Sequence, residues 1–311
     1  MRAYSIFDDF TEDAIRVLTK AGIEIVVHPK RTPRPDDIQM KTILKDYDCV
    51  IIGTSQKISE DMFDSIDSPR IIATASVGLD HIHVPDGKNS LVTILNTPKA
   101  NAQSVAEYTI GCALLCCKRL FEGKDLYLQG KNNKQLYQKP DDLAGKTLGV
   151  VGAGNISAKI IEYGRMMGMH VSCWTAHPEL HPDLKEKGLE FIDLDKLLST
   201  SDVISVNLPN NSGTCNLISS DRVQGMRDDA IFISVSRMET VDYKALFEKA
   251  KQNRGFYVCL DLDVNVDIIE AIYDTPNIIV TPHIAGGTTE TRKRMFLELA
   301  RQITEVKGLQ I

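Results

Sequence analysis

The sequence predicts an α/β protein built on parallel sheets. Short runs rich in Val and Ile recur along its 311 residues with helical patterns between them, and a glycine-rich turn directly follows one of these runs. The run lengths and the flanking Gly, Pro and Asp residues favour strands over buried helices. A chain of this length has room for about two domains.

The composition excludes several classes of protein. Hydrophobic residues make up 43% and charged residues 25%, as in soluble globular chains. Lys and Arg number 36 against 42 Asp and Glu, so the net charge of −6 gives no reason to expect nucleic acid or an anionic membrane as a partner. The first residues do not resemble a signal peptide and no stretch is apolar enough to span a membrane. We expect a cytoplasmic protein.

The seven cysteines point to the same compartment. Their number is odd, they form no CxxC pair, and most of them lie inside apolar runs. Reduced and buried thiols are therefore expected.

The first part of the chain predicts five strands and two helices. Each expected strand is a short apolar run, and the runs lie at 3–7, 23–27, 49–53, 71–74 and 92–95. A first helix is expected at 11–21, closed by Gly22. A long helix is expected at 102–120, followed by an exposed polar arm at 129–142.

A second α/β series begins at Lys146. Its expected strands lie at 147–151, 170–175, 202–209, 230–236, 255–263 and 277–283. The alternation of strands with helical patterns is the signature of a second parallel sheet.

The glycine-rich turn reads Gly152-Ala153-Gly154-Asn155-Ile156-Ser157 and lies between an apolar strand and a helical pattern. Backbone N–H groups and a helix N-terminus in such a turn hold a pyrophosphate, which makes Gly152, Gly154, Asn155 and Ile156 candidate cofactor contacts. Ser157 replaces the third glycine of GxGxxG, a position that serves helix packing and tolerates a small residue. The alternative is an ordinary glycine turn.

An acidic residue about 20 positions later would bind the adenosine ribose. It is absent, because the strand ends at Thr175 and continues with Ala176 and His177. Without that carboxylate, the 2′-phosphate of NADP is not repelled. The site also has no Arg or Lys that would bind this phosphate, so NADP is not required. Both NAD and NADP remain open, and His177 is equally well explained as a solvated loop residue.

Six blocks along the chain form one pattern. They are SVGLDHI at 76–82, NAQSVAE at 101–107, the glycine turn, ISVSR at 233–237, CLD at 259–261 and PNIIVTPHIAG at 276–286. With these blocks, in the family's order and at about its spacing, the chain resembles the D-isomer-specific 2-hydroxyacid dehydrogenases over essentially its whole length.

The resemblance implies a Rossmann dinucleotide-binding domain, residues 99–285, inserted into a flavodoxin-like α/β catalytic domain made of 1–98 and 286–311, with the active site in the cleft. It implies an oxidoreductase that uses NAD or NADP to interconvert a small 2-oxo acid and its D-2-hydroxy acid. It also implies a homodimer formed through the helix and arm at 102–142.

The resemblance assigns the proton transfer to His283. A 2-oxo acid also needs a cationic anchor, and Arg237 can provide paired hydrogen bonds. Backbone N–H groups at Val77 and Gly78 would hold the carboxylate. Further cofactor contacts are expected from Thr175, Val235, Ser236, Asp261 and Gly286.

The sequence departs from the family pattern at two places. In the family a Glu about five residues beyond the position of Asp261 pairs with the catalytic His. This chain has Val266 there, and the neighbouring Asp267 is the candidate replacement. Met238 stands where the family normally has Gly after the Arg, where it either narrows the cleft or fills core space.

Three features leave alternatives open. The basic loop 28–34 either meets a phosphate or phosphonate on the substrate or is a solvated Pro-rich loop. His81 and His83 have alternate spacing but lack further ligands, so no metal site is predicted. The missing Glu also keeps a rival function open, a non-catalytic regulatory protein that senses a dinucleotide.

Overall fold

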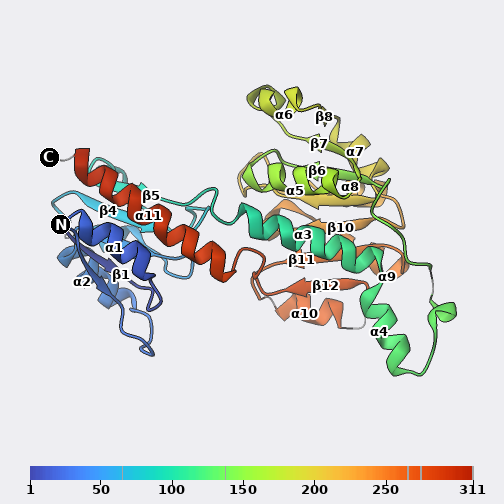
Figure 1. Ribbon diagram of the computed structural model, residues 1–311, viewed down its shortest axis with the longest axis horizontal. Helices are drawn as coiled ribbons and strands as arrows, with labels where there is room; N and C mark the ends of the chain where they lie inside the picture. The colour runs from blue at the N-terminus through green and yellow to red at the C-terminus, as the bar shows by residue number, and fades with distance from the viewer. Residues whose placement is uncertain (65, 137, 265, 274, 310–311) are drawn as a thin grey trace. The chain divides into compact units, whose positions relative to one another are not determined.

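The computed structural model describes residues 1–64, 66–136, 138–264, 266–273 and 275–309. The chain divides into two compact units, one of Met1–Asn101 with Thr288–Ile311 and one of Ala102–Gly287. Figure 1 shows the first unit in blue to cyan, with its last helix in red, and the second unit in green to orange. The functions predicted for the segments 1–98, 99–285 and 286–311 stay predictions.

The first unit is built on a five-stranded parallel sheet of order β2-β1-β3-β4-β5. This is the flavodoxin-like order. The strands lie close to the predicted ranges: β1 Arg2–Ser5, β2 Glu24–Val27, β3 Cys49–Ile52, β4 Arg70–Thr74 and β5 Val92–Leu95. All four residues of β3 are buried, as expected for a central strand covered on both faces.

Three helices cover this sheet: α1 Glu12–Lys20, α2 Asp37–Asp46 and α11 Thr289–Leu309. Helices α1 and α11 pack side by side, although they come from opposite ends of the chain (Figure 1). Helix α11 buries Phe296, Leu299, Ala300 and Ile303 in the same core as Ile6. The first unit therefore needs both terminal segments to complete its core.

The second unit is built on a seven-stranded parallel sheet of order β12-β11-β10-β9-β6-β7-β8. Numbered from β6, its first six strands have the Rossmann order 3-2-1-4-5-6. The strands are β6 Thr147–Val151, β7 His170–Trp174, β8 Glu190–Phe191, β9 Val203–Val206, β10 Ile231–Ser234, β11 Tyr257–Asp261 and β12 Ile278–Thr281. The predicted fold class is confirmed.

Helices cover both faces of the second sheet: α3 Ala102–Cys117, α4 Leu120–Leu128, α5 Asn155–Met166, α6 Pro182–Glu186, α7 Leu194–Thr200, α8 Ser220–Gly225, α9 Tyr243–Gln252 and α10 Val266–Ile272. Alternate residues of one strand enter different cores: Phe232 packs in one, Ile231 and Ile233 in the other. Helices α3 and α5 lie side by side (Figure 1).

The long helix predicted at 102–120 ends earlier, at Cys117. Arg119 has a left-handed backbone, with φ of 52°, and a new helix, α4, begins directly after it. The side chain of Arg119 is buried and donates to Tyr257 Oη at 2.8 Å and to Glu122 Oε2 at 3.0 Å. These contacts offset the strain at Arg119, for which the sequence offers no Gly or Pro signal.

The seven cysteines are all free thiols; six are buried and Cys215 is exposed. Burial raises the pKa of the Cys173 thiol to about 12 and also raises the pKa of Cys49. These two thiols therefore stay protonated at neutral pH and behave as small apolar side chains. Within the part of the chain that the structure describes, no helix is both long and apolar enough to cross a membrane.

Candidate active site

The candidate residues of the second unit gather at the carboxyl edge of its sheet. Thr175 follows β7, Gly152 follows β6, Arg237 follows β10, Asp261 ends β11, and His283 follows β12. Because all strands run parallel, these five positions share one edge. The order reverses between β6 and β9, which is where ligands bind in such sheets.

The glycine turn has the geometry that a pyrophosphate requires. Gly152 has φ of 100° and donates its N–H to Trp174 O at 2.8 Å. A Cβ on Gly152 would lie 2.6 Å from Asn207 O, whereas a Cβ on Gly154, the N-cap of α5, would meet nothing within 4 Å. The turn therefore requires glycine at 152 and leaves open space at 154, in front of the α5 N-terminus.

Two buried polar atoms near this turn are unsatisfied within the described residues. They are Asn207 Oδ1, after β9, and Ser157 Oγ, in the first turn of α5. The open space, the helix N-terminus and the unused acceptor at Asn207 fit a bound dinucleotide. Asn155 and Ile156 form the first turn of α5, where backbone N–H groups lack acceptors inside the helix.

The loop after β7 would meet the adenosine end of the cofactor. Thr175 Oγ1 accepts the N–H of His177 at 3.4 Å, and His177 Nδ1 lies 3.2 Å from Glu179 Oε1. A backbone hydrogen bond and His177 hold the pKa of Glu179 below its usual range. The charged carboxylate of Glu179 lies four residues after Thr175, the position at which a ribose-binding acid is absent.

The segment after β10 is held rigidly. Ser236 Oγ donates to Val206 O at 3.1 Å and accepts the N–H of Leu208 at 2.7 Å, which ties the ends of β9 and β10 together. The hydroxyl of Ser236, predicted to touch the cofactor, thus has a structural role. Val235 and the half-buried Arg237 flank it at the carboxyl edge.

His283 lies on a strained turn after β12. Its φ is 53°, uncommon for a residue other than glycine, and its N–H donates to Thr281 O at 3.0 Å. Its Nδ1 lies 2.9 Å from Asp263 Oδ1, and both side chains are exposed to solvent. A proton on Nδ1 that donates to Asp263 leaves Nε2 to exchange a proton with a substrate.

Asp263 is the carboxylate that sequence reasoning missed. It lies two residues beyond Asp261, at the end of the run predicted as a strand. Asp267, the predicted partner of His283, lies in α10, and its side chain is outside the described part of the structure.

Asp261 fixes the turn that carries His283. Its Oδ1 accepts the N–H of Ile284 at 2.8 Å, and its Oδ2 accepts the N–H of Ala285 at 2.8 Å. Thr281 Oγ1 donates to the same Oδ1 at 2.5 Å. Gly286 follows directly in the chain. The buried carboxylate of Asp261, predicted as a cofactor contact, therefore holds the backbone that follows His283 and the side chain of Thr281, which precedes it.

Comparison with known proteins decides the family. Residues 110–285, more than half of the chain, match the family described as "D-isomer specific 2-hydroxyacid dehydrogenase, NAD binding domain".

The chain belongs to this dehydrogenase family.

Two relatives support the same conclusion. The hydroxypyruvate reductase of Thermotoga maritima is 30% identical over 276 residues, 87% of this chain and 88% of that protein. The glyoxylate reductase of Thermofilum pendens is 27% identical over 296 residues, 93% of this chain and 87% of that protein. The predicted family and the enzyme class, an oxidoreductase that uses NAD or NADP, are confirmed.

A solved structure agrees over the full length. The D-lactate dehydrogenase of Aquifex aeolicus, complexed with NAD and lactic acid, has a TM-score of 0.79 at 26% identity, covering 99% of this chain and 96% of that one.

In this dehydrogenase, Tyr108 supports the turn that carries His283 through a series of hydrogen bonds. Tyr108 Oη, on α3, lies 2.7 Å from Thr281 Oγ1, which donates to Asp261. Burial raises the pKa of Tyr108, so its hydroxyl stays protonated and donates. The hydrogen bonds run from Tyr108 through Thr281 and Asp261 to the backbone next to His283, and each polarises the next.

Replacing Tyr108 by Phe is expected to lower the free energy of unfolding by about 1 kcal/mol, because a half-buried hydrogen bond is lost. We also expect kcat to fall several-fold with little change in the KM of NADH or NADPH, because the His283 turn loosens. Chemical denaturation and steady-state kinetics measure the two effects. Tyr163→Phe, on α5, is the control; an equal effect of both variants would contradict the role of Tyr108.

The candidate carboxylate contacts, Val77 and Gly78, lie in the first unit after β4. Their carbonyls are engaged: Asn96 Nδ2 donates to Val77 O and Ser76 Oγ to Gly78 O, both at 2.8 Å. Among the described residues, no acceptor is found for the N–H groups of Val77 and Gly78. This arrangement suits an anion that accepts both N–H groups.

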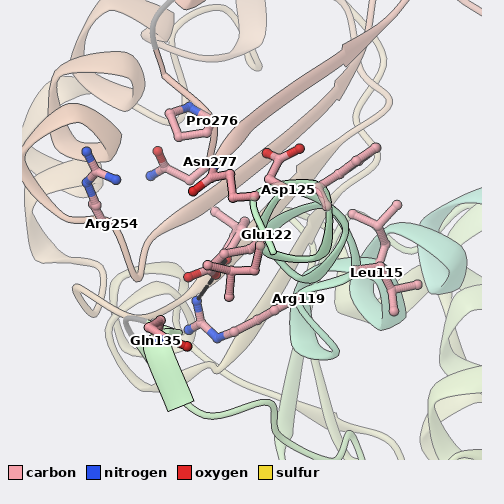
Figure 2. Close-up of a pocket in the computed structure, with 13 residues that line it drawn as sticks. Leu115, Arg119, Glu122, Asp125, Gln135, Arg254, Pro276 and Asn277 are labelled. Carbon is pink, nitrogen blue, oxygen red and sulfur yellow. Dashed lines mark hydrogen bonds and ion pairs between the residues drawn. The ribbon is translucent and has the colours of Figure 1, made fainter. Parts of the chain in front are cut away.

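A separate cavity of about 290 Å³ lies in the second unit, under α4 (Figure 2). Its lining includes Arg119, Glu122 and Tyr257, with Pro276 and Asn277 just before β12. Tyr257 begins β11, so the cavity lies at the amino ends of β11 and β12, opposite the edge that carries His283. It is therefore not part of the candidate active site.

Proposed function

We propose that this dehydrogenase reduces a small 2-oxo acid to its D-2-hydroxy acid with NADH or NADPH, and catalyses the reverse oxidation. The observation that carries the proposal is one sheet edge with three features: the glycine turn at β6, Arg237 after β10, and His283 paired with Asp263 after β12. A dinucleotide site, an anion anchor and a proton donor are the groups that this reaction needs.

The chain's own residues have distinct roles in the proposed reaction. Bound nicotinamide supplies the hydride that is added to the carbonyl carbon. Arg237 holds the oxo acid by charge-assisted hydrogen bonds. His283 delivers a proton from Nε2 to the carbonyl oxygen, while Asp263 keeps the imidazole oriented through Nδ1. In the reverse direction His283 accepts the hydroxyl proton.

A substrate panel tests the proposal. Purified protein is mixed with NADH or NADPH and with glyoxylate, hydroxypyruvate, and phosphate- and phosphonate-bearing 2-oxo acids, and the loss of absorbance at the reduced nicotinamide band is followed. We expect turnover of at least one acid with formation of the D-hydroxy acid. Retained nucleotide binding with no turnover across the panel would overturn the proposal.

The regulatory alternative loses its main support. It was favoured by the missing Glu, which would leave His283 without a carboxylate, but Asp263 Oδ1 lies 2.9 Å from His283 Nδ1. A dinucleotide sensor has no need of this pair. Cofactor-dependent partner binding that survives the loss of His283 would favour the alternative.

The proposed assembly is a homodimer formed through α4. Four large apolar side chains on this short helix are exposed: Leu120, Phe121, Tyr127 and Leu128. Clustered exposed apolar residues mark interaction surfaces. In Figure 1, α4 projects from the end of α3. A second copy of the chain would cover this surface.

Replacing Leu128 by Glu is expected to weaken the dimer about 30-fold or more, because a charge enters the apolar contact. Sedimentation velocity over a range of concentrations measures the change. Met166→Glu is the control, since Met166 is as exposed on α5. A wild-type monomer, or equal dissociation in both variants, would contradict this interface.

A further inference from the structure

The basic loop at 28–34 has a fixed shape. His28 Nδ1 lies 2.8 Å from Tyr4 Oη, and His28 Nε2 lies 2.9 Å from Pro33 O. A carbonyl only accepts, so Nε2 donates to Pro33 O, and in the neutral imidazole Nδ1 then accepts from Tyr4 Oη. Burial raises the pKa of Tyr4, which keeps this hydroxyl protonated. The imidazole of His28, at the start of the loop, is thus bonded to β1 through Tyr4 and to the end of the loop through Pro33. These two contacts fix the path of the chain that leads to Arg34.

Arg34 is held at the carboxyl edge of the first sheet. Its guanidinium lies 5.9 Å from the centroid of the Phe7 ring, just after β1, and its Nη1 donates to Ser55 Oγ, just after β3. Among the described residues, no carboxylate pairs with Arg34. Its Nε and Nη2 therefore remain available for an anion.

The charges around Arg34 are mixed. Arg292, on α11, lies over the same Phe7 ring at 5.2 Å and pairs with Asp9 at 3.2 Å. The exposed carboxylates at this edge are Asp8, after β1, and Asp36 and Asp37, at the start of α2. Lys30 and Arg31, also exposed, precede Arg34 in its loop. The capacity to bind an anion therefore rests on the donors of the Arg34 guanidinium and not on an excess of positive charge.

Arg34 and the Val77 and Gly78 N–H groups lie at the same edge of the first sheet. Ala75 N donates to Ile52 O at 2.8 Å, so β3 and β4 stay paired to their ends. Ser55, which accepts a hydrogen bond from Arg34, follows β3, and Val77 follows the neighbouring strand β4. Two groups that can bind an anion therefore follow the carboxyl ends of adjacent strands.

We infer that Arg34, braced by Phe7 and Ser55, binds a phosphate or phosphonate group on the 2-oxo acid and thereby determines substrate specificity. The inference rests on the proposed function and names the substrate class. The carboxylate binds at Val77 and Gly78, and the tetrahedral dianion accepts from Arg34 Nε and Nη2. Arg34 touches the end of the substrate remote from the reacting carbonyl and takes no part in hydride or proton transfer.

Matched substrates and variants test this role. The substrates are hydroxypyruvate, its O-phosphate and phosphonopyruvate; the variants are Arg34→Ala, Arg34→Lys and the control Lys30→Ala. Arg34→Ala is expected to lower kcat/KM for at least one of the two dianionic acids about 10- to 100-fold, mainly through KM, and to change hydroxypyruvate less than about 2-fold. The substrate whose kcat/KM falls in Arg34→Ala shows whether the subsite binds a phosphate or a phosphonate.

The two controls sharpen the result. Arg34→Lys keeps the charge and is expected to retain part of the preference, whereas Lys30→Ala is expected to retain all of it. An equal loss for all three acids in Arg34→Ala, or no loss for either dianionic acid, would overturn the inference while leaving the proposed function intact.

Failure of the wild-type protein to reduce any 2-oxo acid would instead overturn the proposed function. Calorimetric titration with phosphonopyruvate then tests the Arg34 subsite alone. Binding that Arg34→Ala abolishes supports the subsite, and binding that this variant leaves unchanged overturns it.

Discussion

Replacing His283 by Ala is expected to lower kcat for 2-oxo acid reduction by about 10³-fold, within the range that general acid catalysis contributes. The imidazole is the group placed to protonate the carbonyl oxygen, and Asp263 fixes which nitrogen carries the exchangeable proton. The Kd of the dinucleotide is expected to change little, because the glycine turn after β6 is separated from His283 by several strands. Single-turnover kinetics and nucleotide titration measure the two quantities.

His170→Ala is the matched control for His283. His170 begins β7 and therefore lies at the amino edge of the same sheet, away from the candidate site. Its replacement is expected to leave kcat unchanged. Turnover of His283→Ala close to the wild-type rate would contradict the assignment of the proton transfer.

Replacing Arg237 by Ala is expected to lower kcat/KM by about 10³-fold, since two charge-assisted hydrogen bonds to the substrate are lost. Arg237→Lys keeps the charge but loses the planar pair of donors, so only part of the activity is expected to return. Steady-state kinetics with a saturating dinucleotide measure both variants.

Arg227→Ala provides the matched control for Arg237. The two arginines lie at opposite ends of the same strand, Arg227 before β10 and Arg237 after it. Arg227 pairs with Asp229 at 3.0 Å near the surface, so its loss is expected to cost at most about 1 kcal/mol of stability. Equal kinetic effects of the two replacements would show that Arg237 does not hold the substrate.

The sheets and the glycine turn could be predicted because their signals are local. Apolar runs mark β3, β9, β10 and β11. The sequence blocks that resemble the dehydrogenase family place Arg237 and His283 directly after two of the predicted strands. The requirement for glycine at 152 likewise follows from a short motif, although the close approach of Asn207 O at 2.6 Å to a Cβ there becomes visible only in the fold.

The contact between Asp263 and His283 could not be predicted by counting. Asp261 and Asp263 lie two residues apart, and the path of the chain after β11 decides which of these two reaches the imidazole; the side chain of the predicted partner, Asp267, lies outside the described part of the structure. Asp261 is committed to the backbone of Ile284 and Ala285, and Asp263 lies beside Nδ1. Spacing along the sequence does not encode that path.

The end of α3 was missed for a related reason. Arg119 turns the chain with a positive φ, yet its residue type gives no turn signal. Its conformation is stabilised by Tyr257 and Glu122, one of which lies far away in the sequence. Such tertiary stabilisation overrides local propensity.

The position of α11 in the core of the first unit has a consequence for biosynthesis. During translation, residues 1–101 leave the ribosome first but lack Phe296 and Leu299, which complete their core. The second unit, continuous in sequence, has all its strands available earlier and can fold as a block. Part of the apolar surface of the N-terminal segment therefore stays uncovered until α11 is synthesised, and during that interval this surface is open to aggregation and proteolysis.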